Sequence, residues 1–296
     1  APQEGDEVIG GTPAPATPPC GHPTCTTPGE PMSASPHPTD LGLNLRHLAG
    51  LRKPAHNTTD LIDRIADHLD QHDGYLAFSG GKDSLVTLHL ARQADPNVPV
   101  CFFDSGLEYP ETLRYIADLT DTWHLNLDVI PAARPTLEIL VANGTWSHRR
   151  TVGAHTNLFT NNIAIPSAHA HDRHGPGELW GLRSYESSSR RVMFAQALRR
   201  DPAGGTVHRT NGTVTYSPVW DFTETAIWGH IARHQLPTNP VYDKLTRLGA
   251  PPHAVRVSNM IDATQLEHGR LVWLKRGWPS LYQSIVDALH RATEFA

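Results

Sequence analysis

The sequence predicts an α/β fold in which a doubly wound parallel sheet carries helices on both faces. Short, largely apolar runs at 75–78, 98–103 and 125–130 are typical of strands buried on both sides. Segments with apolar residues at helical spacing separate these runs. Strand and helix therefore alternate along the chain, which favours parallel pairing with right-handed crossovers.

The helices of this half are marked by their boundary residues as well as by their spacing. They are expected over 61–69, 85–92, 110–119 and 136–142. Thr58 or Thr59 is the expected cap of the first helix, because a hydroxyl oxygen can accept a backbone N–H there. Pro110 suits a first helical turn, and Gly144 is suited to close the last of these helices.

The second half of the chain contains fewer strand signals. A strand is expected over 178–182 after a loop-rich region, and an edge strand over 214–217. From Thr223 the sequence is helical nearly to its last residue. It is interrupted at Pro237, Pro240, Pro251, Pro252 and Pro279. The fold is thus an α/β domain with a mostly helical C-terminal region.

Three segments are expected along the chain: an extension over 1–40, a domain over 41–245 and a helical C-terminal extension over 246–296. Ten of the first forty residues are proline, and few are apolar, so this stretch is predicted to be disordered. It does contain Cys20 and Cys25 with a histidine between them. Zinc binding there stays open, although the spacing fits no common zinc site and an unstructured tail is favoured.

Composition excludes several classes of protein. The chain has no run of about 20 apolar residues that could span a membrane, and no basic opening followed by an apolar run. Three cysteines cannot build a disulfide framework, so a reduced, cytoplasmic protein is expected. A formal charge of -5 argues against coating nucleic acid, but leaves room for a local basic groove.

Between the first predicted strand and the next helix lies the segment Ser79-Gly80-Gly81-Lys82-Asp83-Ser84. Its glycines permit a tight turn and close approach of the backbone to a ligand. The following helix supplies unpaired N–H groups and its positive dipole end, which bind anions. Lys82 adds a charge, the two serines add hydroxyls, and Asp83 adds a carboxylate suited to Mg²⁺ on phosphates. The spacing is not that of a Walker A loop.

This loop resembles the SGGxDS pyrophosphate loop of the adenine nucleotide α-hydrolase-like ATP pyrophosphatases, which have a Rossmann-type fold. Further segments resemble the phosphoadenylylsulfate (PAPS) reductases of the same superfamily, in the expected order. They are Phe103 to Thr112 (FDSGLEYPET), Trp180 to Arg190 (WGLRSYESSSR), Tyr216 to Asp221 (YSPVWD), Ile227-Trp228 and Leu236 to Asp243 (LPTNPVYD). Together they cover roughly 74–245, and we identify the chain as PAPS reductase-like.

The resemblance implies a role for each matching position. The 79–84 loop would hold the β- and γ-phosphates, with Lys82 and Asp83 catalytic and Asp83 on the metal. Asp104 and Ser105 would lie near the nucleoside, the alternative for Asp104 being a turn former at the strand end.

Two arginines complete the implied site. Arg183, also expected to be catalytic, and Arg190 would reach the phosphates from the far side of the cleft, as guanidinium clamps do. The alternative for both is a surface ion pair with Glu186.

The sequence departs from the reductases in its cysteines. No cysteine follows Tyr242, where those enzymes carry the one that takes the sulfite. Cys101 lies inside an apolar strand and is expected to be a buried, inert thiol. These departures favour an ATP pyrophosphatase that uses ATP and Mg²⁺ to adenylate an acceptor oxygen, closest to the enzyme of bacterial DNA phosphorothioation systems.

The ATP pyrophosphatase hypothesis implies binding partners, and two alternative functions stay open. A DNA substrate and a cysteine desulfurase as sulfur donor are expected with it, and a homodimer is considered. The first alternative is a PAPS or adenylylsulfate (APS) reductase using thioredoxin, and the second is a non-catalytic nucleotide-sensing subunit.

The sequence contains two further clusters, one of histidines and one of paired arginines. The segment with His169, His171 and His174 is expected to be a solvated loop rather than a metal site. The arginine pairs at 149–150, 190–191 and 199–200 are either a phosphate-backbone groove or ordinary surface charge.

Overall fold

The structure is a computed structural model, and it describes residues 56–145, 156–257 and 270–296. These residues contain one six-stranded sheet in the order β3-β2-β1-β4-β6-β5. The strands are β1 (Tyr75–Ala77), β2 (Pro99–Asp104), β3 (Asn126–Pro131), β4 (Gly177–Trp180), β5 (Thr206–His208) and β6 (Val214–Tyr216). All neighbours pair in parallel except β5, which is antiparallel to β6. The predicted parallel sheet is therefore confirmed.

Helices precede, separate and follow the strands. They are α2 (Thr58–His72), α3 (Lys82–Ala94), α4 (Pro110–Trp123), α5 (Thr136–Ala142), α6 (Ile165–His174), α7 (Ser188–Ala197), α8 (Glu224–His234), α9 (Pro240–Arg247), α10 (Arg270–Gly277) and α11 (Pro279–Ala288). Pro110, Pro240 and Pro279 each occupy the first turn of a helix, where the missing N–H has no partner to lose. Gly144 adopts a φ of 63° just past α5, as the closing residue requires. Across the described ranges, no helix is both long and apolar enough to cross a membrane.

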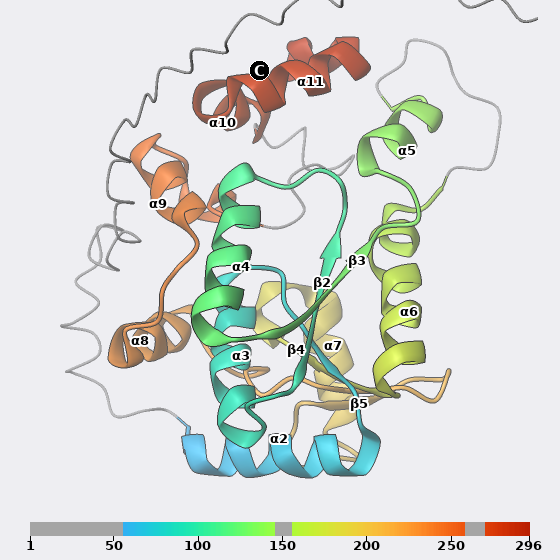
Figure 1. The fold of residues 1–296 in the computed structure, drawn as a ribbon, viewed down its shortest axis with the longest axis vertical. Coiled ribbons are helices and arrows are strands. Elements are labelled where there is room, and N and C mark those ends of the chain that lie inside the picture. The colour runs from blue at the N-terminus through green and yellow to red at the C-terminus, as the bar shows by residue number, and fades with distance from the viewer. Residues whose placement is uncertain (1–55, 146–155, 258–269) are drawn as a thin grey trace, which may run out of the picture. The chain divides into compact units, whose positions relative to one another are not determined.

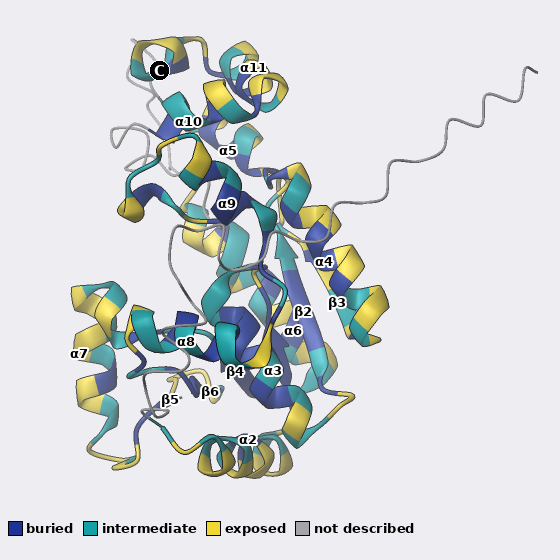
Figure 2. Cartoon of the chain, turned by 90° about the vertical axis from the view of Figure 1, so that its left-hand side faces the viewer, coloured by how far each residue is buried: buried dark blue, intermediate teal, exposed yellow. Residues whose placement is uncertain are grey.

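Alternation along the strands gives the sheet two different faces. Leu76, Val100 and Phe102 belong to a large hydrophobic core, which they share with residues of α3. Their strand neighbours Tyr75 and Cys101 belong to a smaller apolar cluster that includes Ala170 of α6. In Figure 1, α3 and α4 lie along one side of β2, and α6 lies along the other. Figure 2 shows the buried colour of β2 and the exposed outer side of α2. The doubly wound arrangement is thus confirmed.

Two boundary predictions are wrong in detail. The cap of α2 is Asn57, whose side-chain oxygen accepts the N–H of Thr59 at 3.2 Å, so neither Thr58 nor Thr59 is the cap. The strand predicted as an edge, β6, lies between β4 and β5. It is covered because the chain enters β6 through a hairpin from β5, a strand that was not predicted. The hairpin turn contains Asn211-Gly212, a common turn pair.

The segment expected to be a histidine-rich loop is α6. A five-residue π-helical turn, Thr160–Ala164, leads into it, and Pro166 lies in its first turn. Its few apolar residues give no clear helical period. His171 and His174 face buried or half-buried carboxylates on the sheet, so they are not solvated loop residues.

Candidate functional site

The candidate site lies where the strand order reverses. β1 is flanked by β2 and β4, which continue the chain in opposite directions across the sheet. In parallel α/β sheets, ligands bind beyond the carboxyl ends of the strands at such a switch point. The loop 79–84 follows β1, and Gly181 follows β4. A Cβ at Gly181 would lie 2.5 Å from the backbone nitrogen of Ser84, so glycine lets these two segments touch.

The 79–84 loop is held in shape by its own serines. The Ser84 Oγ accepts the N–H of Ser79 at 3.3 Å and donates to the carbonyl of Gly81 at 3.0 Å. Gly80 has a φ of +70°, the left-handed region that glycine adopts freely. α3 then begins at Lys82, and the N-terminus of this helix faces the cleft.

A segment far along the chain supports the same loop. Asn239 donates from Nδ2 to the carbonyl of Gly80 at 3.2 Å and to Thr112 Oγ1 at 2.9 Å. The hydroxyl of Tyr242 accepts the backbone N–H of Lys82 at 2.9 Å. Burial, and then the nearby charge of Asp83, raise the pKa of Tyr242. The sequence does not predict this support, because the contacts join residues about 160 positions apart.

Charged side chains of the 79–84 loop and of the segment after β4 lie close together beside the loop. Asp83 lies 2.8 Å from Lys82 Nζ through Oδ2, and 2.6 Å from Arg183 Nε through Oδ1. Arg183 is buried and also lies 3.8 Å from Glu186, which is ion-paired with Arg190 as well. Both arginines thus make an ion pair with Glu186, although Arg183 is not at the surface, and their contact with phosphates stays a prediction. Both Asp83 oxygens face cations, so Asp83 would have to give up one of these ion pairs to bind a Mg²⁺ ion.

The two predicted site residues at the end of β2, Asp104 and Ser105, differ in whether they line the cleft. Asp104 accepts the N–H of Gly106 at 2.8 Å, the contact of a turn former, and it is not among the described residues that line the cleft. Ser105 does line the cleft and donates to Glu108 at 2.7 Å. Glu108 was not predicted. Burial raises its pKa to about 7, although the hydrogen bond from Ser105 opposes the shift.

The cleft around these residues has a volume of about 1690 Å³. Its described lining includes the cations Lys82, Arg183, Arg190, Arg209, Arg256 and Arg270, and the acids Asp83, Glu108, Glu178, Glu186 and Glu224. The last three arginines were not predicted. No motif marks them, because they reach the cleft through the β5–β6 hairpin and the region after α9. Many guanidinium groups in one cleft suit a ligand with several anionic groups.

The remaining predicted clusters are described only in part. Arg199 and Arg200 are exposed, and neither is among the described cleft residues. Arg149, Arg150 and the tail cysteines Cys20 and Cys25 fall outside the described residues.

Cys101 lines the cleft but is itself buried. Burial, and then the charge of Asp128, raise the pKa of its thiol to about 12. The prediction of a buried thiol is confirmed, and at neutral pH almost none of it is the reactive thiolate.

The fold and the site together define an α/β protein with a glycine-rich loop before a helix at the switch point of its sheet. Residues 74–285 match the phosphoadenosine phosphosulfate reductase domain, and the chain belongs to that family.

Named relatives agree with the family. The chain is 28% identical to the phosphoadenosine 5′-phosphosulfate reductase of Xanthomonas oryzae pv. oryzae over 183 residues, which cover 58% of this chain and 67% of the relative. It is 27% identical to the Escherichia coli protein of the same name over 187 residues, which cover 62% and 72%.

Solved structures are more distantly similar. A PAPS reductase from Candida auris in a phosphate complex has a TM-score of 0.46 and 16% identity, covering 69% of this chain and 90% of that one. An NH₃-dependent NAD synthetase from Campylobacter jejuni has a TM-score of 0.41 and 14% identity, covering 86% and 96%.

These relatives contradict the predicted function. They are named as reductases over most of the chain, so the prediction of an ATP pyrophosphatase acting in DNA phosphorothioation is wrong. The error has a physical cause. A loop and a set of arginines bind phosphates whichever bond is broken, so Lys82, Asp83 and Arg183 cannot distinguish the two reactions. The missing cysteine does not exclude reduction, because the attacking thiol can belong to another molecule. The DNA substrate and the cysteine desulfurase were inferred only from that function.

Proposed function

We propose that this chain is a sulfonucleotide reductase of sulfate assimilation, which binds PAPS or APS in the cleft and releases sulfite. The observation that carries the proposal is the family match over 74–285, which includes both sides of the charged site. A ligand with a sulfate and one or more phosphates also suits the arginine-rich lining.

In this proposal the predicted site residues hold the nucleotide. The 79–84 loop accepts the phosphate that carries the sulfate, because backbone N–H groups and the start of α3 favour anions there. Lys82, Arg183 and Arg190 supply charge, and Ser105 lies toward the nucleoside. Asp83 acts as a positioning residue that holds the lysine and the buried arginine toward the ligand. A magnesium role for Asp83 stays a prediction, and no step depends on it.

The reduction needs two thiols, which we assign to a separate dithiol protein such as reduced thioredoxin. One thiolate attacks the sulfur of the sulfonucleotide, the sulfur–oxygen bond breaks, and the nucleotide leaves with its phosphate. The second thiol attacks the resulting S-sulfonate, which forms a disulfide and releases sulfite. Two thiols are oxidised and sulfur(VI) becomes sulfur(IV). Cys101 is not the attacking group, because its pKa of about 12 keeps it protonated.

The expected contribution of this chain to catalysis is positive charge near the bond that breaks. The leaving phosphate gains negative charge, and preorganised cations stabilise it most when the charge develops. Lys82 and Arg183 are already held in place by Asp83, so they need little rearrangement.

The test is sulfite formation from PAPS and from APS with reduced thioredoxin. We expect sulfite and the nucleotide product in equal amounts, with Lys82→Ala reducing kcat/KM by about 100-fold or more. Cys101→Ala should retain activity. Arg190→Ala should lower kcat/KM, and its charge-matched control is Arg200→Ala, which removes an exposed arginine outside the described lining. Tight nucleotide binding without sulfite would overturn the proposal and favour a nucleotide-sensing subunit.

A further inference from the structure

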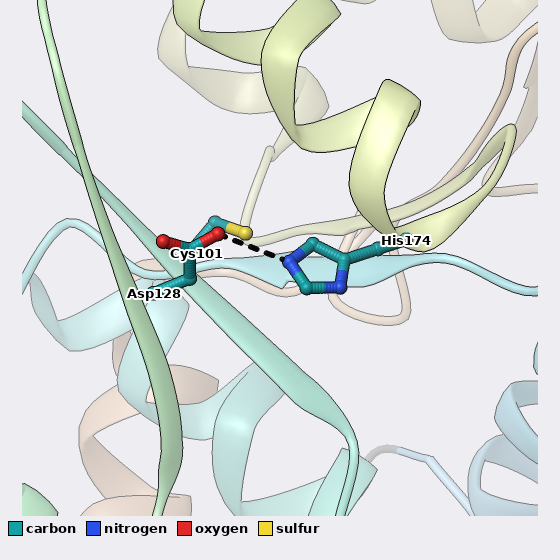
Figure 3. A group of neighbouring side chains, drawn as sticks. All are labelled: Cys101, Asp128 and His174. Atoms are coloured by element: carbon teal, nitrogen blue, oxygen red, sulfur yellow. Dashed lines mark hydrogen bonds and ion pairs between the residues drawn. The ribbon is translucent and has the colours of Figure 1, made fainter.

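The strongest feature outside the charged site is a group of three side chains on the α6 face of the sheet. Cys101 of β2 and Asp128 of β3 are directly opposite each other in the strand pairing, so both point to the same face. His174 is the last residue of α6, which packs on that face. Figure 3 shows the thiol, carboxylate and imidazole converging from these three elements.

Their donor atoms are close enough to share one ion. The sulfur, one carboxylate oxygen and one imidazole nitrogen all lie within 4.8 Å of one another. His174 Nε2 is 3.2 Å from Asp128 Oδ2. Thiolate, imidazole and carboxylate are the three ligand types that proteins use for Zn²⁺. Among the residues that the structure describes, this is the one group of at least three such ligands in reach of each other.

We propose that Cys101, Asp128 and His174 bind a zinc ion, with water in the remaining position. Binding would replace the thiol proton by the metal, since a coordinated thiol is deprotonated. The side chains of His174 and Asp128 are 20% and 25% exposed, so an ion can reach the site from solvent on their side.

Arg173 competes with the metal for the same carboxylate. Its Nη1 lies 2.8 and 2.7 Å from the two oxygens of Asp128. The side chain of Arg173 is 52% exposed, and ion pairs of such exposed groups contribute little. It can therefore turn into solvent when a divalent ion binds. This competition gives the proposal a distinctive signature, because removing an arginine should tighten metal binding.

The test uses Co²⁺ as a spectroscopic substitute for zinc, on the full chain with Cys20→Ser and Cys25→Ser so that tail thiols cannot contribute. We expect one equivalent of cobalt with a thiolate-to-metal charge-transfer band, displaced by Zn²⁺. Cys101→Ser should abolish the band, and His174→Ala and Asp128→Asn should each weaken binding by about 10-fold or more. Arg173→Gln should tighten it by about 2- to 5-fold.

A second histidine cluster provides the matched control. His89 Nδ1 lies 3.0 Å from His230 Nε2 at the contact of α3 and α8, so His230→Ala removes a buried imidazole without touching the proposed site. Cobalt binding with the charge-transfer band should be unchanged in that variant.

Three results would overturn the proposal: no charge-transfer band in the parent protein, a band that survives Cys101→Ser, or weaker binding in Arg173→Gln. Metal-free thermal melts identify any variant that has merely unfolded, and tighter binding in Arg173→Gln cannot arise from unfolding. The result does not depend on sulfite formation, so it is distinguishable from failure of the proposed function.

Discussion

On the face of the sheet covered by α3, Leu76, Leu179 and Tyr216 form a row of apolar side chains across three neighbouring strands. One residue away along the same strands, on the face covered by α6, the row is Tyr75, Glu178 and Thr215. A one-residue shift in a strand exchanges the faces, so the same three strands build an apolar row and a polar row. The comparison teaches that this sheet is stabilised differently on its two sides.

The polar row is a closed hydrogen-bond network. Tyr75 donates to Oε2 of Glu178 at 3.1 Å, and Thr215 donates to Oε1. His171 Nε2 lies 3.4 Å from Oε2. Burial alone would raise the pKa of Glu178, but the hydrogen bonds from His171 and Thr215 lower it to about 2. The pKa of His171 is raised, since the carboxylate outweighs the effect of burial. A buried carboxylate is thus kept charged by its partners.

The largest expected effect is on the apolar face. Leu88 is fully buried in the large core, and Leu88→Ala should lower the free energy of unfolding by about 2–5 kcal/mol, the usual cost of a core cavity. Val192→Ala, at a position 56% exposed, should change it by about 0.5 kcal/mol or less. Denaturant unfolding at pH 7 measures both. Equal losses would mean that the core is not continuous at Leu88.

A smaller effect is expected on the polar face. Glu178→Gln keeps the shape but removes the charge that faces His171, and it should cost about 1–3 kcal/mol at pH 7. The pKa of Glu178 is lower in the folded protein, so its stabilisation is present above pH 4.5 and is lost as the pH falls toward 2. Acid titration of unfolding should therefore be flatter in the variant below pH 4.5. An identical slope would show that Glu178 is not the titrating group.

The apolar face contains a different acid-sensitive group. Burial, and then His234 and His89, lower the pKa of His230 to about 3, so the folded protein holds it neutral. The unfolded chain takes up its proton near pH 6.5, and stability is therefore lost as the pH falls below 6.5. Between pH 7 and 5 the loss should be about 1–2 kcal/mol. His230→Phe should remove this share of the loss, whereas His68 and His89, whose pKa values burial also lowers to about 4, keep theirs. The transition below pH 4.5 should be unchanged. One common transition would contradict the separation of the two faces.

The sequence predicted the parts of the sheet where burial alone decides the structure. The runs at 75–78 and 98–103 are apolar on both faces, so their strands could be predicted without knowing what covers them. α6 could not be predicted in this way. Its position depends on packing of Ala170 and on contacts from His171 and His174 to carboxylates on the strands. The 79–84 loop was predicted from its glycines and charges. The hydrogen bonds from Asn239 and Tyr242 were not, since only the folded chain brings those side chains to it.

The smallest effect is expected for the hydrogen bond by which Tyr242 supports the 79–84 loop. Tyr242→Phe removes one hydroxyl that accepts the N–H of Lys82, and keeps the ring that packs against Trp228. The free energy of unfolding should fall by about 0.5–1.5 kcal/mol, the usual net value of one hydrogen bond. Because the lost contact lies at the first residue of α3, binding of a sulfonucleotide measured by calorimetry should weaken by several-fold, whereas in Glu178→Gln it should weaken less. Thr246→Val removes a hydrogen bond to the backbone carbonyl of Tyr242, one turn further along α9, and serves as the control. If both α9 variants weaken nucleotide binding equally, α9 acts through its overall stability rather than through the hydroxyl that holds the loop.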